Sequence, residues 1–232
     1  QTYSQGFANF YQTVIDLGFT IANACYPMSV DEKARDLSAV YQASAQDHVI
    51  KFSGSEKARI FKALMDTIPR YRDRIRIFSP LCSLDSLVRT YSGQTDLSYP
   101  CQGGINYFFI DAATGHTFPC GYRGQDNFGK FEELDRSKID PDGQCRLCDW
   151  ECFRDPSELF GPILDLLTAP VSLGEKIIRD PNHFRLWLSD LRYYRACDYF
   201  NGRKAPDYDR MARFASKPVP AGADGENRPE LK

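Results

Sequence analysis

The sequence lacks any apolar run approaching the roughly 20 residues that an α-helix needs to cross a bilayer. It also lacks, at its start, the charged segment followed by an apolar stretch that is typical of a secretory signal peptide. These two absences argue against a membrane-spanning or secreted protein. We therefore expect a soluble, cytoplasmic chain without a membrane partner.

The sequence also has little net charge. Its 29 Lys and Arg residues nearly balance 31 Asp and Glu residues, which leaves −2 at pH 7. Such a chain offers no basic field for a nucleic-acid backbone, so we expect no nucleic-acid partner. Histidine is scarce too, because only His48, His116 and His183 are present. They are scattered along the chain and predict neither a catalytic triad nor a histidine-rich metal site.

Cysteine, by contrast, is abundant and unevenly distributed. Five of the eight cysteines lie between residues 101 and 152, and two of them form a CxxC pair. A disulfide framework is more typical of short secreted chains with cysteines along their whole length. The sequence therefore favours metal or cluster ligation in this region. The other three, Cys25, Cys82 and Cys197, are expected to be small buried core residues.

The first 94 residues alternate between helical and extended patterns. Apolar spacing and two capping boxes define the elements. In order, we expect helix 7–17, a short buried strand 19–25, a helix opened by Ser29–Glu32, strand 48–52, a helix opened by Ser53–Glu56 and ended by Pro69, strand 74–78 and a short helix over 84–91. This βαβα order predicts a parallel sheet with helical crossovers and an α/β fold.

The pattern changes near residue 95. The segments GGINYFFID and HTFPCGYRG flank a short turn that ends at Gly115, which predicts a β-hairpin with a positive φ at that glycine. Two helices are expected further on, over 156–168 and 182–200, and the polar tail is expected to be disordered. The expected units are thus residues 1–94, 95–155, 156–215 and 216–232.

The five clustered cysteines predict a thiolate site. Four convergent thiolates complete either a tetrahedral zinc site or one 4Fe-4S cluster. Cys101 precedes the first hairpin strand and Cys120 lies near the end of the second, so the hairpin can bring both to one end. Cys145 and Cys148 supply a close pair, and Cys152 follows one helical turn later if a helix has begun. We favour the first four as ligands, with Cys152 as the alternate and a zinc ribbon without redox activity as the alternative site.

The residues around these cysteines resemble a known family. Thirteen residues separate Cys101 from Gly115, four separate Gly115 from Cys120, and a CxxC pair follows. Together with Ile110, Asp111 and Pro119, this pattern resembles the SPASM or twitch domain of radical S-adenosylmethionine (SAM) enzymes. The resemblance covers residues 95–155 well. It implies that residues 1–94 are the C-terminal part of a partial (β/α)6 TIM-like barrel, and Ile77–Pro80 is similar to the family's junction between barrel and auxiliary domain.

The resemblance also implies a function. The chain would be the C-terminal portion of a radical SAM enzyme whose auxiliary 4Fe-4S cluster supports substrate binding or electron transfer. The implied substrate is a peptide or small molecule, and the implied electron source is a redox donor such as a flavodoxin or ferredoxin. A single auxiliary cluster, the twitch arrangement, is expected because only three residues separate the CxxC pair from Cys152.

The family's motif for SAM cleavage, CxxxCxxC, is absent from this sequence. We therefore expect this chain alone not to cleave SAM, and the SAM-cleaving 4Fe-4S cluster to belong to a part that precedes Gln1. Asn23 is a candidate contact to SAM because it lies at the carboxyl end of an expected barrel strand. The alternative for Asn23 is a turn or backbone-bonding role.

Overall fold

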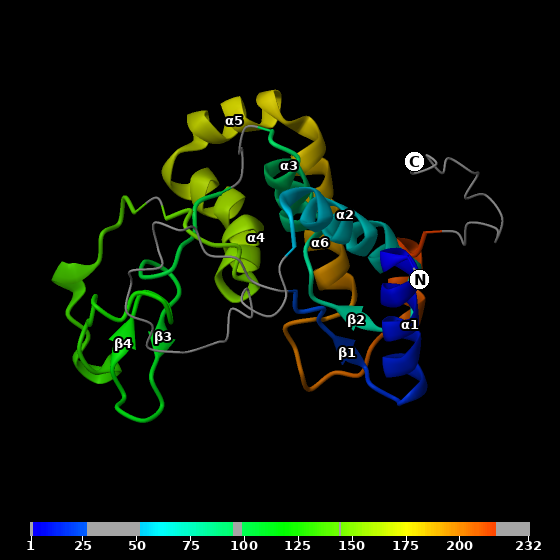
Figure 1. The fold of residues 1–232 in the computed structure, drawn as a ribbon, viewed down its shortest axis with the longest axis horizontal. Coiled ribbons are helices and arrows are strands. Elements are labelled where there is room, and N and C mark those ends of the chain that lie inside the picture. The colour runs from blue at the N-terminus through cyan, green and yellow to red at the C-terminus, as the bar shows by residue number, and fades with distance from the viewer. Residues whose placement is uncertain (1, 27–51, 95–98, 144, 217–232) are drawn as a thin grey trace, which may run out of the picture.

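The computed structural model describes residues 2–26, 52–94, 99–143 and 145–216. Helices form one side of the molecule, and a lobe of loops with a short hairpin forms the other (Figure 1). The fold is thus mixed α and β with helix in excess. In the described part of the chain, no helix is long and apolar enough to cross a membrane.

The described residues form eleven helices and strands, together with short 3-10 turns at Ile68–Arg70, Phe131–Glu133, Arg136–Lys138 and Ala212–Phe214. In chain order they are α1 (Tyr3–Asp16), β1 (Ile21–Ala22), α2 (Gly54–Thr67), β2 (Arg76–Ile77), α3 (Leu81–Tyr91), β3 (Phe109–Ile110), β4 (Thr117–Phe118), α4 (Glu151–Thr168), α5 (Pro170–Arg179), α6 (Pro181–Ala196) and α7 (Tyr208–Met211).

The N-terminal helices begin and end where local chemistry requires. The Thr2 hydroxyl accepts the Gln5 N–H and starts α1 earlier than the apolar spacing predicts, and Gly18 with a φ of +83° ends it. The capping box at Ser53 and Glu56 is confirmed, with reciprocal bonds between side chain and backbone that open α2. Helix α2 packs against α1 and α3 around a core that includes Phe61, Leu64 and Leu84.

Strands β1 and β2 pair in parallel, as the βαβ order predicts, with Ile21 opposite Arg76 and Ala22 opposite Ile77. Both are only two residues long, and the expected burial of strand 19–25 is wrong at Phe19 and Ile21, which are exposed. The pairing joins the first and third expected strands directly. Within the described residues there is no closed barrel.

Three expected segments lie wholly or mainly outside the described residues. They are the helix opened by Ser29–Glu32, strand 48–52 apart from Phe52, and the tail beyond Ser216.

Helix α6 lies beside β2, where the Tyr193 hydroxyl accepts the Ile77 N–H, and α4 lies beside the hairpin lobe (Figure 1). Helix α6 confirms the helix expected over 182–200, and α4 begins at Glu151, before the predicted start at residue 156. Helix α5 was not predicted, although Pro170 at its first position is a typical helix start. A second core forms where α4 and α6 meet α7, with Leu159, Tyr193 and Met211 fully buried.

A buried ion pair joins Arg72, which precedes β2, to Asp190 of α6. An Arg72 terminal nitrogen (Nη2) lies 2.7 Å from the Asp190 carboxylate, and both side chains are almost completely buried. The other Asp190 oxygen accepts the Cys82 N–H at 3.0 Å, so this carboxylate also serves the N-terminus of α3, where Pro80 provides no side-chain cap. The Arg72 guanidinium packs over the Tyr193 ring, 4.3 Å from its centroid.

We predict that Asp190→Leu lowers the free energy of unfolding by about 3–5 kcal/mol, because it leaves the buried Arg72 charge without its counterion. The double variant Arg72→Met/Asp190→Leu should recover part of that loss, since it removes the stranded charge. Urea unfolding of the reduced protein measures both. A double variant less stable than Asp190→Leu would contradict this account of the pair.

Candidate metal centre

The predicted hairpin is present and brings the first two cysteines together. Phe109 pairs with Phe118 and Ile110 with Thr117 in antiparallel register. The turn closes through the Asp111 side chain, which accepts the Ala113 N–H and the Thr114 hydroxyl, and Gly115 adopts the expected positive φ of +72°. The strands are shorter than the sequence pattern suggests, because the chain turns again at Gly103–Tyr107.

Cys101 and Cys145 are joined through their backbones. They form an isolated antiparallel bridge in which the Cys101 N–H donates to the Cys145 carbonyl at 2.9 Å. The Cys101 sulfur in turn accepts the Gly103 N–H at 3.3 Å. The hairpin segment and the CxxC segment therefore meet at these two cysteines.

Cys120 and Cys148 complete a set of four neighbouring thiols. The pKa of the Cys101 thiol is raised to about 11 and that of Cys148 to about 12, chiefly by burial and in smaller part by the nearby thiols. Burial also raises the pKa of Cys120, with Cys145 as a neighbour. Each of the four thus lies within electrostatic reach of at least two others, although they come from three separate segments.

Backbone N–H groups point at three of these sulfurs. Gly103 donates to Cys101, Tyr122 and Arg123 donate to Cys120, and Trp150 donates to Cys148. Such donors favour the ionised form of a thiol and oppose the effect of burial on its pKa. Thiolates, not thiols, are metal ligands, so the backbone here is arranged to stabilise the form that binds metal.

Aromatic rings pack beside the thiols. Trp150 contacts Tyr122 at 5.5 Å and Phe153 at 5.0 Å between ring centroids. The Phe153 side chain is buried. A Cβ at Gly103 would meet both the Phe153 ring and the Cys101 sulfur, so the Phe153 ring packs close to Cys101.

Cys152 and Cys25 lie together, apart from the four. Helix α4 begins at Glu151, so Cys152 is in its first turn as the sequence suggests. The groups that raise the pKa of Cys152 to about 11, after burial, are Glu151, Cys25 and Asp155. The expected burial of Cys25 is wrong, because this residue is exposed, whereas Cys82 and Cys197 are buried as predicted.

The four thiols are suitable ligands for a metal group. Four cysteines whose sulfurs accept backbone N–H groups are typical of zinc sites and of iron–sulfur clusters. As they stand, no three Cys, His or carboxylate side chains within the described ranges close around one metal ion. Four zinc-bound thiolates would lie about 3.8 Å apart, given a Zn–S distance near 2.3 Å. A four-iron cluster is larger than one ion and is bound by thiolates further apart.

Two glycines allow the hairpin to approach Cys101 closely. A Cβ at Gly103 would lie 2.9 Å from the Pro119 carbonyl oxygen and 3.3 Å from the Cys101 sulfur. A Cβ at Gly104 would lie 2.7 Å from the Pro119 Cβ, and this glycine has a φ of +85°. Only glycine fits both positions without displacement of the residue before Cys120.

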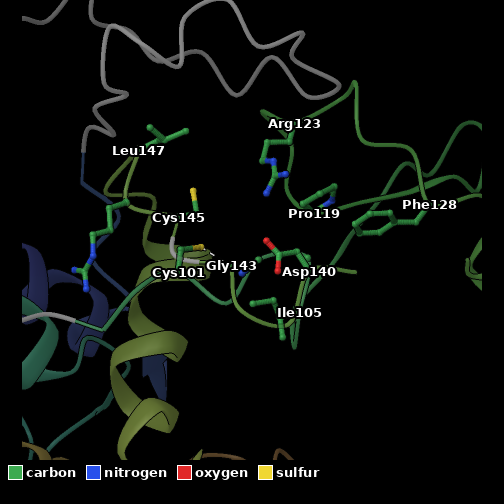
Figure 2. Close-up of a pocket in the computed structure, with 12 residues that line it drawn as sticks. Cys101, Ile105, Pro119, Arg123, Phe128, Asp140, Gly143, Cys145 and Leu147 are labelled. Carbon is green, nitrogen blue, oxygen red and sulfur yellow. Dashed lines mark hydrogen bonds between the residues drawn. The ribbon is translucent and has the colours of Figure 1, made fainter. Parts of the chain in front are cut away.

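A cavity of about 520 Å³ opens on one side of the thiols (Figure 2). Cys101 and Cys145 form part of its wall, but Cys120 and Cys148 do not. Arg123 and Asp140 also line this cavity. Sequence reasoning singled out neither residue, because a lone Arg in a loop and a lone Asp in a turn carry no motif.

Asn23 lies at the carboxyl end of β1, as predicted, and its side chain forms a hydrogen bond with Ser79, which follows β2. The Ser79 hydroxyl donates to the Asn23 side-chain oxygen at 3.0 Å. Asn23 also lines an apolar cavity of about 640 Å³ with Phe7 and Phe10 of α1. The bond to Ser79 favours a structural role, and a contact to SAM stays a prediction.

Comparison of the chain with protein-family models, curated proteins and solved structures gave no match. The function is therefore argued from the site itself.

We predict that Gly104→Ala lowers the free energy of unfolding more than Gly115→Ala. Both glycines have positive φ, so each variant should lose about 1 kcal/mol from backbone strain. A methyl group at residue 104 also meets Pro119, whereas the space around Gly115 is open, so Gly104→Ala should lose roughly 1–3 kcal/mol more. Urea unfolding of the two variants measures the difference. Equal losses would show that Gly104 is not in close contact with Pro119.

Proposed function

We propose that Cys101, Cys120, Cys145 and Cys148 bind one 4Fe-4S cluster, and that the chain is the C-terminal portion of a radical SAM enzyme. The observation that carries the proposal is the convergence of four thiols from three segments, with backbone N–H donors aimed at three of them. The spacing of Cys101, Gly115 and Cys120, and its resemblance to SPASM and twitch domains, supplies the enzyme class.

The choice of cluster over zinc rests on the spacing of Cys101, Gly115 and Cys120, which resembles that of SPASM and twitch domains. The choice of Cys148 over Cys152 draws support from their surroundings, because Cys148 neighbours the other three thiols and Cys152 neighbours Cys25 and Glu151.

A cluster held by these four thiolates would supply one-electron transfer, because each of its irons would already carry a cysteine ligand. Tyr122 and Trp150 pack against each other and follow Cys120 and Cys148 by two residues, and their backbone N–H groups donate to the sulfurs of these cysteines. Cys101 and Cys145 line the cavity, so a small molecule can reach the site from that side. The chain lacks CxxxCxxC, so SAM cleavage is assigned to a preceding part of the enzyme.

We predict that the protein purified and reconstituted without oxygen carries about four irons and four sulfides per chain, as one cubane requires. Changing any one of Cys101, Cys120, Cys145 or Cys148 to Ala should lower the iron content below four per chain, because one iron corner of the cube then has no cysteine ligand and is lost first. Iron and sulfide analysis with a visible spectrum measures this.

Cys152→Ala and Cys25→Ala are the matched controls and should keep the iron content of the unchanged protein. Stoichiometric zinc without iron would replace the proposal by a zinc-stabilised module that has no redox activity. Loss of iron in Cys152→Ala with retention in Cys148→Ala would move the fourth ligand to Cys152.

A further inference from the structure

The cavity beside Cys101 and Cys145 contains two opposite charges that face one another. Figure 2 shows the Arg123 guanidinium and the Asp140 carboxylate pointing into the same space. They come from different segments, since Arg123 follows Cys120 and Asp140 precedes the CxxC pair. The two side chains do not form an ion pair with each other, because Arg123 pairs with Asp126.

The Arg123 side chain keeps donors for a ligand. Its Nε–H donates to Asp126 at 2.8 Å. A guanidinium has five N–H donors, so this bond fixes the side chain and leaves the two terminal nitrogens to meet a carboxylate in bidentate fashion. The side chain is about one third exposed, with 36% of its surface open to solvent.

The Asp140 carboxylate is fixed by its own turn. Its Oδ1 accepts the Asp142 N–H at 3.1 Å, and its backbone carbonyl accepts the Gly143 N–H at 3.2 Å. These bonds hold the carboxylate at the rim of the cavity, where it can accept hydrogen bonds from an ammonium group.

Part of the rest of the wall is apolar, although Arg146 also lines the cavity. Ile105, Pro119 and Phe128 supply apolar surface, and the Phe128 side chain is buried (Figure 2). An apolar group of a ligand can therefore leave water there while its charged ends reach Arg123 and Asp140.

We propose that this cavity binds a small zwitterion of the free amino acid type, with its carboxylate at Arg123, its ammonium group at Asp140 and its side chain against the apolar wall. A simple anion would meet repulsion from Asp140, and a simple cation would meet repulsion from Arg123. The interior of a peptide has neither charged end and would leave both groups unpaired. That the cavity is the substrate site of an enzyme rests on the proposed function, whereas the binding of a zwitterion to the cavity can be tested by itself.

The test is calorimetric titration of the complete, metal-loaded chain with L-leucine, L-leucinamide and N-acetyl-L-leucine. L-leucinamide lacks the carboxylate and N-acetyl-L-leucine lacks the ammonium group, so each should bind about tenfold more weakly than L-leucine. Arg123→Gln should abolish the preference for L-leucine over L-leucinamide. Asp140→Asn should abolish the preference over N-acetyl-L-leucine.

Arg136→Gln and Asp209→Asn are the matched controls, because both side chains are exposed and neither lines the cavity. Equal affinity for the three probes, or an equal effect of the control substitutions, would overturn the inference. Metal analysis of the same samples separates it from the proposed function. A zinc-loaded chain that prefers L-leucine would support the cavity site and exclude the cluster. A chain that carries the iron–sulfur cluster but shows no preference for L-leucine would support the cluster and exclude the cavity site.

Discussion

The hydrogen bond from the Cys101 N–H to the Cys145 carbonyl, at 2.9 Å, fixes two distant parts of the chain against each other. On one side it holds the start of the hairpin segment, and on the other the CxxC pair. Between residues 99 and 150 the strands are only two residues long, and few apolar side chains are buried. A lobe with so little core depends on such cross-connections, and a metal group bound by the thiols would add folding free energy to them.

Helix α4 connects this lobe to the helical side of the molecule. The Ser157 hydroxyl accepts the Gln102 N–H at 2.9 Å, next to Cys101. The Tyr99 ring lies directly on Gly161, where any larger residue would collide with it. From the other face of α4, the Leu159 carbonyl accepts the Trp187 indole N–H at 2.8 Å. The positions of Cys101 and Cys148 therefore depend on how α4 packs against α6.

Much of this arrangement could be predicted from the sequence, where local chemistry determines it. The capping box at Ser53, the parallel pairing of two strands and the hairpin turn at Gly115 were all predicted and are confirmed. The grouping of Cys101 and Cys120 followed from the length of the hairpin. These features depend on short-range hydrogen bonds and on backbone conformation, which the residue types specify directly.

The features that could not be predicted from the sequence depend on contacts between distant segments. Cys25 is exposed beside Cys152 because the end of β1 meets the start of α4, which no local pattern indicates. The Arg72–Asp190 pair and the facing of Arg123 and Asp140 are of the same kind. Strand lengths were overestimated because apolar runs such as 19–25 were interpreted as buried, while Phe19 and Ile21 lie at the surface.

Iron X-ray absorption spectroscopy of the anaerobically reconstituted protein tests the central claim most directly, because it reports the neighbours of the metal. A 4Fe-4S cluster bound by Cys101, Cys120, Cys145 and Cys148 predicts a shell of sulfur neighbours together with a shell of iron neighbours. A sulfur shell alone around iron, or a protein that binds only zinc with Zn–S distances of about 2.3 Å, would contradict it.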